Sequence, residues 1–259
     1  MIRQTIEALG RSSINFICQL GAIAVFVADI IIATLNPPLR YRQFMDELYK
    51  LGVLSLVIIS VCGVAVGMVL GLQGYNTLVR FGAEDALGAV VGLSLVRELG
   101  PVLTALLTTG RAGSATTAEI GTMVAKEQLD GLRMMSVDPI DFVIRPRALA
   151  MTFVMPLLGA LFVVCGILGG FLVGVTLMGI DPGTYLTAME SSIDLRNDVA
   201  ACLLKTLIFG LIVGVIATYR GYTSEPTTAG VSRATTSTVV TASVSILVSD
   251  YFITALWGV

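Results

Sequence analysis

Six long apolar runs follow one another along this chain, and they constrain its fold more than any other feature. They cover about residues 14–35, 51–72, 87–109, 149–178, 199–219 and 239–257. A run of about 20 apolar residues is long enough to cross the hydrocarbon core of a bilayer as an α-helix. The strands of a membrane barrel would instead alternate apolar and polar residues, which these runs do not. The pattern therefore predicts an all-α integral membrane protein built as a single transmembrane domain over residues 1–259.

The composition excludes several classes of function. Hydrophobic residues make up 55% of the chain, charged residues only 13%, and histidine is absent. Without histidine, Ser-His catalysis and imidazole metal ligation are excluded. The cysteines stand alone inside apolar runs, which indicates small buried side chains rather than zinc ligands or a redox pair. These are Cys18, Cys62, Cys165 and Cys202. We expect no catalytic residue, no metal, no cofactor and no nucleic-acid partner.

Basic residues predict how the spans are oriented. Three of the linkers between apolar runs are rich in lysine and arginine, and they must share one side if the last five runs all cross the membrane. They hold Arg40, Arg42 and Lys50, then Lys126, Arg133, Arg145 and Arg147, then Arg220 and Arg233. The opposite linkers hold only Arg80 and Arg196. Because positively charged loops stay in the cytoplasm, the basic side is predicted to be cytoplasmic.

The first apolar run, within residues 1–40, differs from the others in the charges at its two ends. Arg3 and Arg11 precede it and Arg40 follows it, so both of its ends favour the cytoplasm. We predict a helix that lies in or dips into the membrane, followed by five spans and an outward C-terminus. The alternative is a sixth span with an external N-terminus.

The linker between the third and fourth runs has the period of an amphipathic helix. Over residues 120–138 its apolar residues recur every three or four positions, and charged residues fill the other face. Asp138-Pro139 is expected to end this helix. Such a cytoplasmic helix either lies on the membrane or docks into a groove of a partner, and its mixed charges favour docking.

Small residues are spaced four apart in residues 63–74, 110–115 and 166–174. Faces of this kind let two helices approach closely in lipid. We interpret them as internal packing, with a seam between two copies of the chain as the alternative.

Charged residues inside apolar runs are costly and mark sites of interest. Arg97 and Glu98 are adjacent and point about 100° apart on a helix, so each needs another partner. They are either an interfacial pair that reaches water or the polar rim of a cavity for an amphipathic ligand. Arg111 is expected to reach the inner headgroups or the C-terminus of a helix. Lys205 and Asp250 lie at one depth on consecutive antiparallel helices, so a structural ion pair is predicted.

Several motifs in order resemble the MlaE-type permease family over about residues 45–257. They are GLQGY (71–75), LVRELGPVLTALLTTGRAGSATTAEIGTM (95–123), EQLDGLRMMSVDP (127–139), PR (146–147) and GVSRATTSTVV (230–240). Members of this family are inner-membrane subunits of ABC systems that carry lipids between the two membranes of Gram-negative bacteria. The resemblance implies a multi-pass homodimeric permease with five spans, a membrane-embedded N-terminal helix and a cytoplasmic coupling helix at residues 120–138.

The resemblance also implies two sets of site residues. The lipid would be bound by Leu70, Gln73, Tyr75, Leu78, Arg97 and Glu98. The coupling to an ATPase would use Glu119, Met123, Lys126, Glu127, Leu129, Asp130, Leu132 and Arg133.

The implied function is movement of phospholipid between the inner membrane and the periplasm or outer membrane, which supports outer-membrane lipid asymmetry. The implied partners are a cytoplasmic ATP-binding subunit, a periplasmic MCE-domain subunit and a small cytoplasmic STAS-domain subunit. The chain lacks a GxxxxGK[ST] loop, so ATP hydrolysis is expected on another chain. The alternatives are a secondary transporter of an amphipathic solute, which the lack of an internal repeat disfavours, and a non-transporting scaffold.

Overall fold

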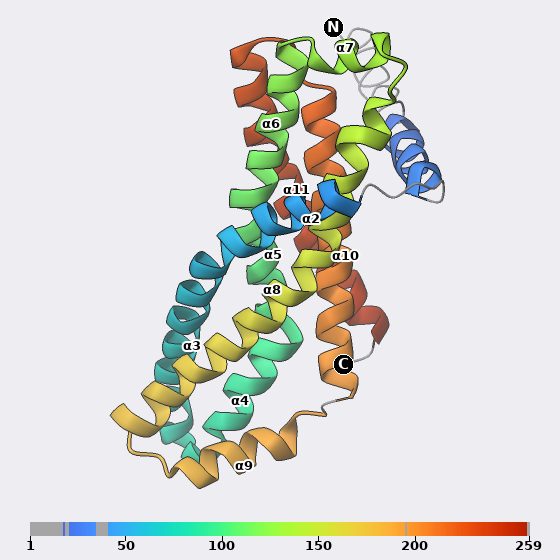
Figure 1. Cartoon of the computed structure of the whole chain (residues 1–259). Coiled ribbons are helices and arrows are strands. Elements are labelled where there is room, and N and C mark those ends of the chain that lie inside the picture. The colour runs from blue at the N-terminus through green and yellow to red at the C-terminus, as the bar shows by residue number, and fades with distance from the viewer. Residues whose placement is uncertain (1–17, 19–20, 35–40, 195, 258–259) are drawn as a thin grey trace, which may run out of the picture.

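The computed structural model describes residues 18, 21–34, 41–194 and 196–257, which form helices, turns and loops without any strand. Five helical stretches in this part of the chain are long and apolar enough to cross a membrane, as predicted. They are Tyr41–Phe81, Glu84–Ala125, Ile140–Leu177, Asn197–Tyr222 and Thr228–Leu256. They form an elongated bundle in which α7 lies at one end and α9 at the other (Figure 1).

The first apolar run appears as the shorter helix Gly21–Thr34, which is not among the helices long enough to span. Phe26 packs against the rings of Tyr219 and Tyr222, at centroid distances of 5.4 and 5.8 Å. This contact holds the helix against the end of the bundle that carries α7 (Figure 1). The basic residues that flank the run lie, except for Arg42, outside the described residues, and the placement of residues 1–40 at the membrane interface stays a prediction.

The first span is bent because its two halves have different sequences. It consists of α2 (Tyr41–Gly52), η1 (Val53–Ser55), α3 (Leu56–Leu78) and η2 (Val79–Phe81). In α2, charged residues alternate with apolar ones, and Phe44, Leu48 and Leu51 pack on the core. α3 is apolar all round and descends at an angle from α2 toward α9 (Figure 1). The boundary between them is therefore where an amphipathic helix becomes a membrane span.

The second and third spans contain π-helical turns. The second consists of η3 (Glu84–Ala86), α4 (Leu87–Ser94), η4 (Leu95–Leu99), α5 (Gly100–Thr108), η5 (Thr109–Gly113) and α6 (Ser114–Ala125). The third consists of η6 (Ile140–Ile144), α8 (Arg145–Phe171) and η7 (Leu172–Leu177). The segments η4, η5, η6 and η7 are π-helical. A π-turn widens the helix locally and redirects side chains, and such turns are frequent at functional sites.

The single amphipathic helix predicted over residues 120–138 does not form. Residues up to Ala125 continue α6, and a separate short helix, α7 (Gln128–Met134), follows. Glu127 adopts the left-handed conformation, with φ of 55°, and interrupts the helix between them. Ile120 is fully buried against Gly221, so the tertiary packing of α6 extends it past the predicted start of the linker helix.

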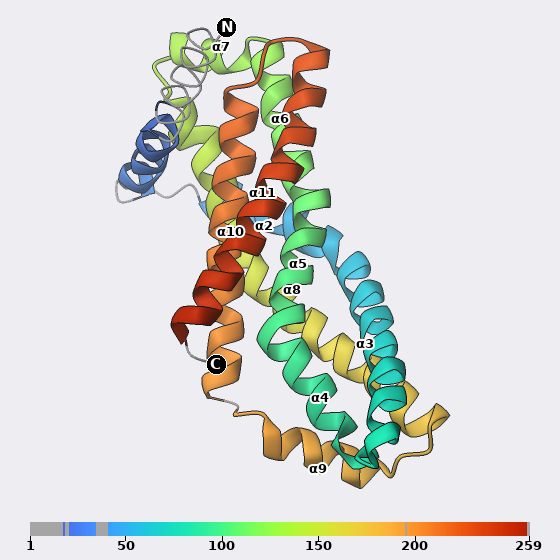
Figure 2. The ribbon, with the colours of Figure 1, turned by 180° about the vertical axis from the view of Figure 1, so that it is seen from behind.

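The opposite end of the bundle is closed by α9 (Pro182–Ser192), which lies across the end of α4 (Figure 2). Asp181 caps α9 by accepting a hydrogen bond from the Thr184 N–H at 2.9 Å. Tyr185 is fully buried and its ring meets Phe171 edge-on at 5.6 Å. Burial raises the pKa of Tyr185 to about 12, so its hydroxyl stays protonated. The chain then returns through α10 (Asn197–Tyr222) and α11 (Thr228–Trp257).

The contact between α3 and α8 depends on glycines, which confirms internal packing for residues 63–74 and 166–174. A Cβ on Gly67 would lie 1.8 Å from the carbonyl oxygen of Gly166, and one on Gly71 3.1 Å from that of Gly170. In the third small-residue segment, Gly110 has no atom within 4 Å of the position of a Cβ, whereas a Cβ on Gly113 would lie 3.3 Å from Val213 of α10. Backbones that approach this closely gain dispersion contacts along the whole helix pair.

Candidate functional site

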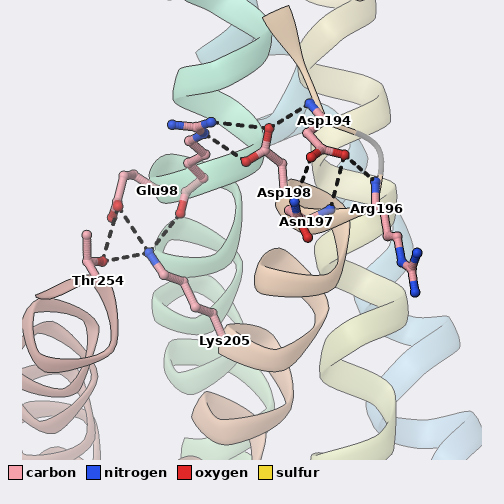
Figure 3. Close-up of polar contacts among 8 residues, drawn as sticks. Glu98, Asp194, Arg196, Asn197, Asp198, Lys205 and Thr254 are labelled. Carbon is pink, nitrogen blue, oxygen red and sulfur yellow. Dashed lines mark hydrogen bonds and ion pairs between the residues drawn. The ribbon is translucent and has the colours of Figure 1, made fainter. Parts of the chain in front are cut away.

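Charged side chains from three helices meet inside the bundle, toward the end closed by α9. We call these residues the charge cluster. It consists of Arg97 and Glu98 on η4, Asp198 and Lys205 on α10, and Asp250 and Thr254 on α11. Figure 3 shows the contacts among most of these residues and how they join η4 to both C-terminal helices.

Lys205 is the centre of the charge cluster. Its side chain is 5% exposed, and its Nζ lies 3.0 Å from Glu98 Oε1 and 3.2 Å from Asp250 Oδ1. The same Nζ donates to the hydroxyl of Thr254 and to the carbonyl oxygen of Arg97, each at 2.8 Å. The lysine therefore fills its donor capacity within the protein.

The carbonyl of Arg97 is available to Lys205 because of the local sequence. In an α-helix the N–H of residue 101 would bond to this oxygen, but residue 101 is proline and has no N–H. Lys205 supplies the missing donor from the neighbouring helix. Pro101 thus leaves the Arg97 carbonyl without its usual backbone donor inside an apolar run, and Lys205 of the charge cluster replaces that donor.

Arg97 contacts a different carboxylate. Its Nε lies 2.9 Å from Asp198 Oδ1, and its Nη2 lies 3.4 Å from Asp198 Oδ2. The Asp198 side chain is 2% exposed and also accepts the backbone N–H of Asp194 at 2.9 Å (Figure 3). A buried carboxylate held by a guanidinium and a backbone donor is a well-satisfied arrangement.

The structure brings the predicted partners Lys205 and Asp250 together and adds Glu98 to them. Arg97 and Glu98 bond to different helices and not to each other, as their directions on η4 require. Asp198 was missed by the sequence reasoning. Its signal was the seven-residue spacing to Lys205, which places both side chains on one face of α10. The side chains of Arg97 and Glu98 are 36% and 42% exposed, so solvent or a ligand can reach these two members of the charge cluster.

The four site residues predicted on α3 divide into two groups. Leu70, Tyr75 and Leu78 are half-buried and pack against the apolar cluster that contains Leu87. Gln73 is exposed. In the described residues no hydrogen bond or ion pair joins these four to Arg97 or Glu98. The chain alone therefore does not assemble the whole predicted lipid site.

A second network of charges lies toward the α7 end. Arg147, on α8, is 7% exposed, and its guanidinium lies 3.0 Å from Glu119 on α6 and 3.5 Å from Glu47 on α2. Arg111 donates to the Ser55 hydroxyl at 2.5 Å. The π-turn η5 thus directs Arg111 to the bend between α2 and α3, a contact that the sequence did not predict, and its reach to headgroups stays a prediction.

The predicted coupling residues also differ in what they can contact. Leu129 is buried, and Met123 and Leu132 are half-buried against the same apolar cluster. Asp130 and Arg133 form an exposed ion pair at 2.9 Å, and Lys126, Glu127 and part of Glu119 face solvent. Two apolar side chains that the site prediction did not include point outward instead. Met134 and Met135 are 89% and 68% exposed.

Comparison with known proteins places these features in a family. The family described as "Permease MlaE" matches residues 44–256. The chain is 46% identical over 256 residues to the intermembrane phospholipid transport system permease protein MlaE of Haemophilus influenzae, covering 99% of this chain and 98% of that protein. It is 40% identical over 256 residues, again 99% and 98% of the two chains, to a probable ABC transporter permease protein of Rickettsia typhi. It is 30% identical over 237 residues to the chloroplastic protein TRIGALACTOSYLDIACYLGLYCEROL 1 of Arabidopsis thaliana, covering 91% of this chain and 67% of that one.

Proposed function

The chain belongs to the MlaE permease family, and we propose on this basis that it is the membrane subunit of an ABC transporter that moves phospholipid between the inner membrane and the periplasm or outer membrane. The observation that carries the proposal is the match over 99% of the chain to a protein named for intermembrane phospholipid transport. The five spans and the charge cluster inside them are consistent with this proposal. In a Gram-negative cell this activity would contribute to the lipid asymmetry of the outer membrane.

The lipid site is proposed to lie between two copies of the chain. The first and last spans are the least covered by the rest of the chain. In their most apolar stretches 22% and 11% of the residues are buried, against 44–50% in the other three spans. Exposed apolar side chains run along both of them. On α3 these include Val57, Val61, Val69 and Leu72, and on α11 Val240, Val244, Leu247 and Tyr251. α5 contacts α11 and lies between it and α3 in both views (Figures 1 and 2).

A second copy on this face would complete the predicted lipid site. Gln73 and the half-exposed Arg97 and Glu98 supply the polar groups, and the open faces of α3 and α11 supply apolar walls. Leu70 and Leu78 are half-buried on α3 and would contact the acyl chains, and Tyr75 with Gln73 would meet the headgroup region. An amphipathic ligand needs this combination of a charged rim and an apolar wall.

The energy is proposed to come from an ATP-binding subunit docked at α7. The periplasmic MCE-domain subunit and the cytoplasmic STAS-domain subunit are part of the same proposal, and they rest on family resemblance. Localisation in the bacterial inner membrane follows from the same assembly. A ligand is moved only if the states before and after ATP binding have different affinities for it.

The function is tested with the complex that co-purifies with the full chain, reconstituted into liposomes that contain a fluorescent phospholipid. We expect a P-loop ATPase to co-purify and the labelled lipid to move only when ATP is supplied. A secondary transporter would use the charge cluster for ion coupling and would work in the chain alone under an ion gradient. Transport that follows the gradient and ignores ATP would therefore replace the proposal with that alternative.

Met134→Glu is expected to abolish binding of the ATP-binding subunit and to leave the stability of the spans unchanged. The side chain is 89% exposed on α7, so the new carboxylate stays in water in the free chain but would be buried in an apolar groove of a partner. Co-purification and thermal unfolding measure the two effects.

Two further variants serve as controls for this surface. Met134→Leu keeps an apolar side chain of similar volume and should retain the partner. Leu132→Glu should instead lower the thermal stability, because Leu132 packs against the apolar cluster under α7. An intact complex with Met134→Glu would show that the partner docks elsewhere.

A further inference from the structure

A large apolar groove lies on the other side of the molecule from the charge cluster. Its cavity volume is about 1090 Å³, slightly above the roughly 300–1,000 Å³ that is typical of small-ligand sites. Its walls come from α2, η6, α8 and α10, and Thr34 at the end of the helix Gly21–Thr34 adds to them. The main apolar lining residues are Phe44, Leu149, Phe153, Leu157, Leu203 and Leu207. None of the residues predicted to bind lipid is part of it.

Helix geometry separates this groove from the surfaces described above. On α10 the groove is lined at positions 200, 203, 204 and 207, whereas Asp198 and Lys205 point to a different face. On α8 the groove is lined by Phe153 and Leu157, whereas Gly166 and Gly170 meet α3. The groove therefore opens away from the face that we assign to a second copy.

One end of the groove carries a buried cation with an unused donor. The Arg145 side chain is 4% exposed and lines the groove, and its Nη1 bonds to Asp141. Its Nη2 is buried and has no hydrogen-bond partner in the described part of the chain. A buried N–H of a guanidinium is costly to leave without an acceptor. The group that this position lacks is a hydrogen-bond acceptor, and phosphate oxygens suit a guanidinium well.

The length of the groove fits one leaflet of a bilayer. From Arg145 to Leu157, α8 rises by roughly 18 Å at about 1.5 Å per residue. Half of a hydrocarbon core of about 30 Å is roughly 15 Å. Arg145 is the first residue of α8, and the apolar lining residues Leu149, Phe153 and Leu157 follow it along the same helix. The polar end and the apolar length thus have the order of a headgroup and an acyl chain.

We propose that this groove holds one bilayer phospholipid, with its phosphate diester on Arg145 Nη2 and an acyl chain along α8 and α10. Asp141 bonds to Nη1 and is 34% exposed, which leaves Nη2 as the donor for the phosphate. A transmembrane helix of a partner is the competing occupant, and loss of that subunit when the groove is filled would reveal it. This lipid is separate from the transported one, so the inference goes beyond the proposed function and does not depend on it.

The test counts phospholipids retained by the purified full chain, with the subunits that accompany it, by native mass spectrometry. Leu157→Trp fills the groove, and Leu168→Trp is the matched control on the same helix. Both leucines are exposed, at 71% and 55%, and only Leu157 lines the groove. With dioleoylphosphatidylethanolamine as the probe, wild type and Leu168→Trp should retain one more lipid per chain than Leu157→Trp.

The headgroup contact is tested with dioleoylglycerol, which has the same acyl chains and no phosphate. Wild type should prefer the phospholipid on the order of tenfold, as a hydrogen bond to a charged group implies. The double variant Arg145→Gln with Asp141→Asn, which leaves no lone charge, should lose this preference.

Equal lipid counts for wild type and Leu157→Trp would overturn the proposal, as would equal retention of both probes by wild type. Loss of a partner subunit from Leu157→Trp with an unchanged lipid count would assign the groove to a protein helix instead. If the double variant fails to fold, the two tryptophan variants still decide the question.

Discussion

Gly67→Ala is expected to remove most of the folded protein, although it adds only one methyl group. A Cβ at this position would lie 1.8 Å from the carbonyl oxygen of Gly166 and 2.8 Å from its Cα, and both atoms belong to backbone that cannot rotate away. The two helices must therefore separate along their length. Overpacking usually costs about 1–3 kcal/mol, and we expect the upper end or more here, since the displaced atoms are backbone.

The environment of the two helices makes this loss larger. In lipid no hydrophobic force draws helices together, so α3 and α8 depend on close dispersion contacts. Separating them at Gly67 also loosens the contacts of Gly63 with Phe162 and of Gly71 with Gly170. Contacts along the whole glycine-lined face of α3 are thus lost together.

The measurement is the yield of monodisperse protein and its unfolding in a detergent titration. Gly110→Ala is the matched control, because it makes the same substitution inside another span where no atom lies within 4 Å of the new Cβ. It should behave like wild type. If Gly67→Ala unfolds at the same point as Gly110→Ala, then α3 and α8 are not held by this contact.

These glycines also show how far sequence reasoning reaches. Their four-residue spacing predicted close helix packing, because that spacing depends only on helix geometry. It could not predict that the partner is α8, since small residues at 110–115 had the same spacing, and there Gly113 faces Val213 of α10 while Gly110 has no neighbour. The five spans were predictable for a similar reason, since they follow from residue type along the chain and need no long-range contact.

The parts that could not be predicted depend on local backbone geometry. The left-handed Glu127 splits the predicted linker helix, and glutamate has no special preference for that conformation. The π-turn η5 directs Arg111 toward Ser55, and no residue pattern predicts such a turn. Lys205 and Asp250 were predictable as partners by depth, whereas Glu98 joins them through the direction that η4 gives it.

Lys205→Met is expected to destabilise the chain strongly. The variant keeps the volume of the side chain but leaves Asp250, Glu98 and the carbonyl of Arg97 without their shared donor. Removing one partner of a buried ion pair typically costs about 3–5 kcal/mol, because the charge that stays behind is desolvated. The same detergent titration and the yield of folded protein measure the loss.

A second variant separates the effect of losing the lysine from the cost of leaving the Asp250 carboxylate unpaired. In Lys205→Met with Asp250→Asn, no charge is left alone on α11, and Glu98 is 42% exposed and can reach water. Ion pairs that are replaced as a unit by neutral residues often cost little. We therefore expect the double variant to recover a large part of the stability that Lys205→Met loses. Equal instability of the two variants would mean that Asp250 is not what the lysine neutralises.

The rescued variant also decides whether the pair has a role in transport. If Lys205 and Asp250 only hold η4, α10 and α11 together, the double variant should move phospholipid with ATP at a rate close to that of wild type once it is folded. If instead it folds and binds the ATP-binding subunit but does not transport, the pair takes part in the movement of the lipid. Arg97 and Glu98 share the same cluster and keep about a third or more of their side chains exposed, so a ligand could then act on Lys205 through Glu98. The ratio of transport to folded protein, measured for both variants against wild type, separates these two roles.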